Sequence, residues 1–140
     1  MIMITEETTK NENSQLVKSF YAAFSRGDIQ KILDGLSDNI EWFVPGPKQI
    51  PYAGTHNGKE NVKNFFVTLG KTAEFNPFEL KELVAQGDKV VALGYYGGRA
   101  KTTGNKFEAD WAMVWTVKNG KAVSFKEYMD PTGFAKAFSN

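Results

Sequence analysis

The first half of the chain carries its apolar residues at helical spacing. They recur three and four positions apart in three successive segments, which predicts three amphipathic helices. Ser14 and Asp28 can cap the first two helices, and Gly27 and Gly70 end the first and the third. The predicted apolar faces are Leu16, Val17, Phe20, Tyr21 and Phe24; Ile29, Ile32, Leu33 and Leu36; and Val62, Phe65, Phe66 and Leu69.

The second half of the chain changes to a period of two, which is typical of strands. Strands are predicted over residues 40–44, 75–86, 89–101, 106–117 and 122–129. Pro77 lies inside the second of these and favours a sheet edge or a bulge. A short apolar helix around Phe134 and Phe138 closes the chain. Helices followed by an antiparallel meander predict one α+β domain over residues 14–140, preceded by a flexible tail over residues 1–13.

The turn at Asn119-Gly120 decides which face of the last two strands points inward. A two-residue turn would pair an apolar row with a polar one, because opposite residues share a face. A three-residue loop with Gly120 in a bulge would pair Val117 with Lys121 and join the two apolar rows. We therefore expect the three-residue loop. The opposite pairs would then be Trp111 and Glu127, Met113 and Phe125, and Trp115 and Val123.

Glu127 is the one carboxylate in this otherwise apolar row. Burying an ionised carboxylate is costly unless the group is paired or protonated. Burial would raise the pKa of Glu127 toward neutrality, which is the range useful for a general acid or base. Two interpretations stay open at this point: a functional carboxyl on the inner face, or a residue near the strand end that pairs with a lysine or arginine.

Composition narrows the classes of function. The 140 residues include 17 Lys and Arg against 16 Asp and Glu, so no basic field favours nucleic acid or an anionic membrane. The absence of cysteine excludes disulfides, thiolate metal sites and thiol nucleophiles, and a single histidine predicts no metal site. No secretory signal or membrane-length apolar stretch is visible, so we expect a cytoplasmic protein. The 11 Phe, 5 Tyr and 3 Trp can build an apolar pocket.

Several motifs resemble the nuclear transport factor 2-like superfamily. Within it, residues 14–138 are most similar to the group of SnoaL-like polyketide cyclases and ketosteroid isomerase-like proteins. The motifs that carry the resemblance are Arg26-Gly27-Asp28, Trp42-x-x-Pro45-Gly46, Tyr52-Ala53-Gly54-Thr55, Gly58-Lys59-Glu60-x-Val62, Phe65-Phe66, Asn119-Gly120-Lys121 and Glu127-Tyr128-x-Asp130.

The resemblance implies a cone-shaped fold, in which a strongly curved sheet wraps around the N-terminal helices and encloses an apolar pocket, in a homodimer. It implies isomerase, cyclase or hydratase-type acid–base chemistry on a small apolar molecule, without metal or organic cofactor. The acid that the cyclases carry on the last strand corresponds to Glu127. Their histidine corresponds to Met113, and the isomerase tyrosine falls near Phe20.

The candidate catalytic residues are therefore Glu127 and His56. His56 is the only histidine, and the resemblance places its loop near the pocket mouth; the alternative is a solvated loop residue. A non-catalytic ligand-binding protein and a protein-interaction domain of the same fold remain alternatives to an enzyme. The expected substrate-binding residues are Phe20, Phe24, Trp42, Tyr52, Phe66, Tyr95, Trp111, Met113, Trp115 and Phe125.

Overall fold

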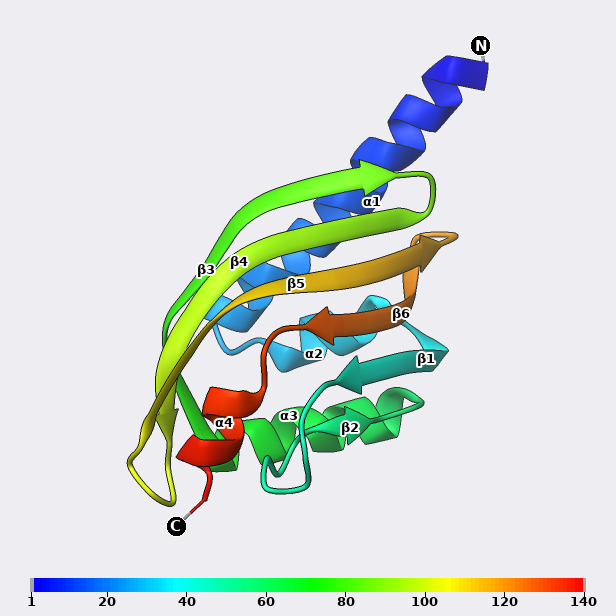
Figure 1. Cartoon of the computed structure of the whole chain (residues 1–140). Coiled ribbons are helices and arrows are strands. Elements are labelled where there is room, and N and C mark those ends of the chain that lie inside the picture. Colours follow the sequence, from blue (N-terminus) through cyan, green and yellow to red (C-terminus); the bar gives the residue numbers. More distant parts are fainter. Residues whose placement is uncertain (1, 140) are drawn as a thin grey trace.

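The computed structural model describes residues 2–139, with side chains from residue 9 onward. Met1, the start of the predicted tail, and Asn140, the end of the predicted domain, lie outside the described residues. The fold is α+β, as the sequence predicts (Figure 1). In chain order its elements are α1 (Ile2–Ser25), α2 (Ile29–Asp34), β1 (Leu36–Val44), β2 (Gly54–Thr55), α3 (Lys59–Thr72), β3 (Ala73–Gln86), β4 (Lys89–Ala100), β5 (Lys106–Lys118), β6 (Lys121–Tyr128) and α4 (Thr132–Ala137).

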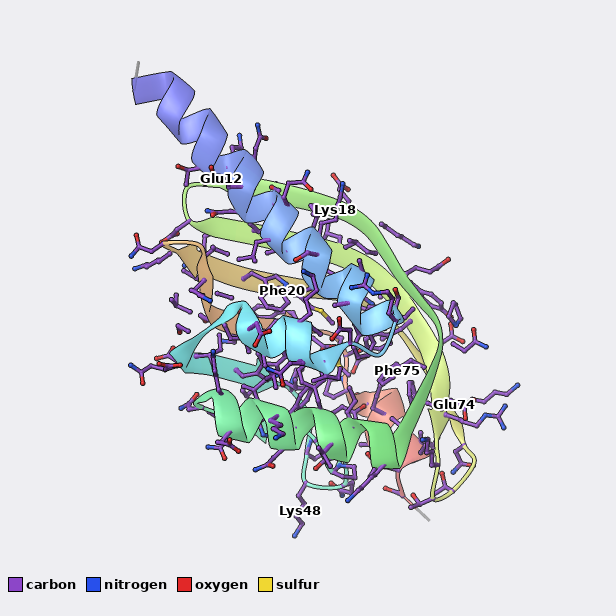
Figure 2. The ribbon with its side chains drawn as sticks, turned by 180° about the vertical axis from the view of Figure 1, so that it is seen from behind. Glu12, Lys18, Phe20, Lys48, Glu74 and Phe75 are labelled. Atoms are coloured by element: carbon purple, nitrogen blue, oxygen red, sulfur yellow. The ribbon has the colours of Figure 1, made fainter. Side chains whose placement is uncertain are left out.

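The strands form one curved sheet with the order β2-β1-β6-β5-β4-β3. The pairing of β1 with β6 is parallel and the other pairings are antiparallel, so the sheet is mixed. Helices α1, α2 and α3 all cover the same face of the sheet, and β3 and β4 bend around them (Figures 1 and 2). Most of the core therefore lies between these helices and the concave face.

The bend in β3 and β4 comes from glycines and bulges. A Cβ at Gly94 or Gly98 would collide with a backbone carbonyl oxygen of β3, so only glycine allows this close approach. The register between β3 and β4 shifts twice, and Pro77 lies within one of these shifts on the edge strand. The sequence-based placement of Pro77 at an edge or a bulge is confirmed.

The predicted start of the first helix at Ser14 is wrong, because α1 already begins at Ile2. Residues 2–13 are helical, and the first turns project beyond the sheet (Figure 1). The segment before Ser14 contains no glycine or proline. A helix that is already nucleated therefore extends through it at one hydrogen bond per residue, without a second nucleation cost. The second helix is shorter than predicted. Gly35 caps α2 at its C-terminal end, so Leu36 begins β1 instead of continuing the helix.

The predicted three-residue loop between β5 and β6 is also wrong. Asn119 and Gly120 both have positive φ, 53° and 76°, and form a two-residue turn. A bulge immediately afterwards adds one residue to β6, which brings the apolar row of β6 onto the apolar row of β5. The inward face was therefore predicted correctly, but the partners are displaced. The observed pairs include Met113 with Glu127 and Trp115 with Phe125.

Candidate functional site

A cavity lies between the three helices and the concave face of the sheet. It is lined by side chains from α1, α2, α3, five strands and the segment between β1 and β2, and aromatic rings make up most of its wall. The space inside it that the centre of a water molecule can occupy is about 70 Å³. Ligand pockets usually measure roughly 300–1,000 Å³, so a ring-sized ligand fits only if lining side chains move. Phe24, Phe66 and Phe78 are half-buried members of the wall, and their rings are candidates for that movement.

Among the described residues, Glu127 is the only carboxyl that lines this cavity. Its side chain comes from β6 on the concave face, and the residue is 6% exposed. One of its oxygens, Oε2, accepts a hydrogen bond from the hydroxyl of Tyr96 on β4. Burial raises the pKa of Glu127 from 4.5 to about 7, although the Tyr96 hydrogen bond acts in the opposite direction. Among the described residues no lysine or arginine pairs with it, so the interpretation as a strand-end ion pair is wrong.

Three phenols share the cavity with Glu127. Burial, followed by the charge of Glu127, raises the pKa of Tyr52 and Tyr96 above the ordinary value of 10, so both stay protonated at neutral pH. Tyr21 is paired twice: its hydroxyl accepts from Nε1 of Trp115 at 3.0 Å and donates to Sδ of Met113 at 3.0 Å. The Tyr52 hydroxyl has no hydrogen-bond partner among the described residues.

Aromatic contacts hold the apolar part of the wall together. Trp42 of β1 stacks on Phe125 of β6 with ring centroids 4.0 Å apart, and Phe20 of α1 packs on Trp115 at 5.0 Å. Figure 2 shows the side chains filling the space between the helices and the sheet. Such a wall excludes water and strengthens every electrostatic interaction inside it.

Eight of the ten residues predicted to bind substrate line the cavity. Tyr95 does not: it lies on the outer face of β4, where its hydroxyl donates to Oε1 of Glu108 at 3.3 Å. Trp111 is buried behind the wall, stacked on Tyr21 at 5.7 Å. The eight that line the cavity are Phe20, Phe24, Trp42, Tyr52, Phe66, Met113, Trp115 and Phe125.

Tyr96, the partner of Glu127, was not among the predicted site residues, whereas its neighbour Tyr95 was. The period of two does not select Tyr96, because both rows of β4 are apolar: Val90 and Ala92 alternate with Val91 and Leu93. The burial of Val90, Ala92 and Tyr96 in the structure shows which row faces inward.

The structure does not bring His56 into the cavity beside Glu127. Its ring packs on Phe65 with centroids 5.1 Å apart, and its Nε2 lies 2.8 Å from the backbone oxygen of Tyr52. With a proton on Nε2, the imidazole donates a hydrogen bond to that carbonyl oxygen and holds the segment that carries Tyr52 in place. His56 therefore supports the wall of the cavity without lining it.

Among the described residues, no group of three or more His, Cys, Asp or Glu side chains is placed to hold a metal ion. No described helix is both long enough and apolar enough to cross a membrane.

Comparison with known proteins gives the family. The family model of the SnoaL-like domain matches residues 17–125, more than half of the chain. The chain belongs to the SnoaL-like domain family. This SnoaL-like chain is 30% identical over 128 residues to the uncharacterized protein Rv0034 of Mycobacterium tuberculosis (strain ATCC 25618 / H37Rv), across 88% of this chain and 93% of that protein.

Two solved structures show the fold of this SnoaL-like domain. An NTF2-like protein from Burkholderia xenovorans LB400 has a TM-score of 0.85 at 38% identity, over 93% of this chain and 98% of that chain. TerC, co-crystallized with polyporic acid, has a TM-score of 0.81 at 26% identity, over 92% and 99% of the two chains. The fold is NTF2-like, which confirms the resemblance seen in the sequence.

The SnoaL-like family match includes nearly the whole cavity. Every lining residue lies within residues 17–125 except Glu127, which follows two positions after the match ends. The family match therefore spans the aromatic wall of the cavity but not Glu127. The interpretation of Glu127 rests on its burial and its hydrogen bond with Tyr96.

Proposed function

We propose that this SnoaL-like domain binds a small, largely apolar molecule in the cavity and that Glu127 acts on it as a general acid and base. The observation that carries the proposal is a buried carboxyl, hydrogen-bonded to Tyr96, inside an aromatic wall. A carboxyl whose pKa is about 7 is populated in both protonation states near neutral pH, so it can take up a proton and return it. The co-crystallization of TerC with polyporic acid supports an organic ligand.

The chemistry that this arrangement supports is proton transfer at a carbon next to a carbonyl group. The carboxylate of Glu127 takes the proton, the C–H electron pair forms a C=C bond, and the carbonyl π pair moves onto oxygen. The protonated Glu127 then returns the proton to carbon, and the carbonyl re-forms. The step needs no cofactor, because the carboxyl supplies and recovers the proton. The apolar wall protects the intermediate from water.

The test uses cyclohexanone as a probe in deuterated water. Exchange of its α-protons is followed by proton NMR near neutral pH, with wild-type protein and with Glu127→Gln. We expect the protein-dependent exchange rate to fall by about 100-fold or more in Glu127→Gln, since general acid–base groups contribute on that scale. Glu108→Gln is the matched control, because Glu108 lies exposed on the outer face. Equal exchange by wild type and Glu127→Gln would overturn the catalytic role.

One observation favours a binding protein without catalysis. His56 does not line the cavity, so the only polar partner of Glu127 among the described residues is a phenol that stays protonated. This alternative predicts that cyclohexanone binds, as seen by calorimetry, while the wild-type protein leaves its α-proton exchange at the rate in buffer.

We also propose that the domain forms a homodimer through the outer face of the sheet. Val84, Val91 and Val114 lie opposite one another on β3, β4 and β5, and Tyr128 at 50% exposure extends the apolar surface onto β6. An apolar patch of this kind on a sheet face is typical of an association surface.

A further inference from the structure

Tyr52 carries the one unpaired phenol of the cavity wall. The residue is 4% exposed and lies in the irregular segment between β1 and β2. The hydroxyls of Tyr21 and Tyr96 are both hydrogen-bonded within the protein, whereas the hydroxyl of Tyr52 has no partner among the described residues. A buried hydroxyl without a partner gives up its hydrogen bonds to water, which costs stability. Such an exception in a cavity wall needs an explanation.

The position of Tyr52 is fixed by its surroundings. Its ring packs edge-on against Phe65 at 6.0 Å and against Phe138 at 5.8 Å, and His56 is hydrogen-bonded to its backbone oxygen at 2.8 Å. Tyr52 and Glu127 line the same cavity, and the charge of Glu127 contributes to the raised pKa of the Tyr52 hydroxyl. The unpaired donor is therefore held in place in the same wall as the carboxyl of Glu127.

Trp42 supplies a second unpaired donor. Its Nε1 is buried without a hydrogen-bond partner among the described residues, and its ring contacts the same Phe65 ring at 5.6 Å. Both Trp42 and Tyr52 line the cavity. The wall thus offers two free donors and the carboxyl of Glu127, whereas the hydroxyls of Tyr21 and Tyr96 are already paired, and a ligand oxygen would pair with the free donors.

We propose that the Tyr52 hydroxyl donates a hydrogen bond to an oxygen of the bound molecule, and so selects carbonyl compounds over hydrocarbons of the same shape. The inference rests on the proposed function, because it requires a molecule in the cavity. A carbonyl oxygen only accepts hydrogen bonds, so the carboxylate of Glu127 cannot pair with it, whereas the hydroxyl of Tyr52 can. In the proton transfer proposed above, the same hydrogen bond stabilises the negative charge that develops on that oxygen.

The test compares two probes with the same ring. Cyclohexanone carries a C=O group where methylenecyclohexane carries a C=CH₂ group of similar size, and the affinity of each is measured by calorimetry. We expect Tyr52→Phe to weaken the binding of cyclohexanone by about tenfold and to change that of methylenecyclohexane by less than about threefold. Tyr95→Phe removes the same hydroxyl from the outer face and is expected to change neither affinity.

The outcomes of this test distinguish a failure of the Tyr52 hydrogen bond from a failure of the proposed ligand binding. If Tyr52→Phe weakens both probes equally, or leaves cyclohexanone binding unchanged, Tyr52 only packs in the wall and the inference is overturned. If neither probe binds to the wild-type protein, the proposed ligand-binding function fails first, and this inference fails with it.

Stability provides a second readout that does not depend on any probe. Tyr52→Phe is expected to have a melting temperature equal to or above that of the wild type, because the lost hydroxyl has no partner to leave behind. Tyr96→Phe makes the same chemical change but removes the donor of Glu127, so its melting temperature is expected to fall. A fall for Tyr52→Phe as large as that for Tyr96→Phe would show that its hydroxyl is already paired inside the protein, and would contradict the proposal.

Discussion

The protonation of Glu127 depends on two opposing effects on one side chain. Burial removes the water that would stabilise the carboxylate, which raises the pKa of Glu127, and the hydroxyl of Tyr96 replaces part of that stabilisation. Burial is the larger effect, so the pKa settles at about 7. The three phenols of the wall stay neutral at that pH, because burial raises the pKa of each. Glu127 is therefore the group in the wall that can exchange a proton near neutral pH.

The raised pKa of Glu127 predicts a dependence of stability on pH. Its folded-state pKa of about 7 exceeds the ordinary 4.5, so the folded state holds the proton more tightly than the unfolded state. The resulting stabilisation is complete below pH 4.5 and is lost as the pH rises to about 7. A shift of this size corresponds to about 3 kcal/mol in the free energy of unfolding.

Denaturant unfolding of wild type and Glu127→Gln at several pH values measures this effect. The wild type should lose stability relative to Glu127→Gln between pH 4.5 and about 7, because glutamine does not titrate. A constant difference between the two proteins across that range would contradict the prediction.

The residues of the site differ in how far the sequence could predict them. Glu127 was identifiable because it breaks a period-two row of apolar residues, and the structure confirms its burial. Tyr96 could not be separated from Tyr95 in this way, because both rows of β4 are apolar. His56 and Tyr52 lie outside the long strands and helices. In such segments the spacing of apolar residues does not predict the direction of a side chain. The unpaired state of the Tyr52 hydroxyl depends on packing between distant segments, so only the structure shows it.

Among the elements, long periodic segments were predictable and their junctions were not. The four long strands lie within a few residues of their predicted bounds, and α3 ends two residues after the predicted end at Gly70. The β5–β6 hairpin combines a two-residue turn with a bulge. Compared with the predicted three-residue loop, the turn and the bulge each shift the pairing of β5 with β6 by one residue. Their combined effect restores the inward face that the apolar pattern requires, while the individual partners shift. The pattern therefore predicts faces, whereas the partners depend on local turn and bulge geometry.

At the scale of the whole molecule, the curved sheet presents two different apolar faces. The concave face packs on α1, α2 and α3 and encloses the cavity with Glu127, so it serves the proposed chemistry. The outer face carries the row of Val84, Val91 and Val114. No described helix covers this face of the sheet (Figure 1). Covering that face by a second copy of the chain would remove it from water, which is favourable in proportion to the apolar area buried.

The proposed homodimer can be tested by sedimentation velocity at micromolar concentration. The wild type is expected to sediment with about twice the 15.6 kDa mass of one chain, because apolar burial on the outer face drives association. Val114→Glu puts a charge into that face and should give the single-chain mass. Val67→Glu is the control, since Val67 is 48% exposed on α3, on the other side of the sheet. A wild type that sediments as one chain would rule out the homodimer.

Glu127 is a buried carboxyl of the cavity wall, and burial raises its pKa to about 7. The most direct measurement is a titration of its side-chain carboxyl carbon by ¹³C NMR, with the resonance assigned from its absence in Glu127→Gln. The structure predicts a midpoint at about pH 7, caused by burial and moderated by Tyr96. A midpoint at the ordinary value of 4.5 would mean that water reaches the carboxylate, and would contradict the account of this site.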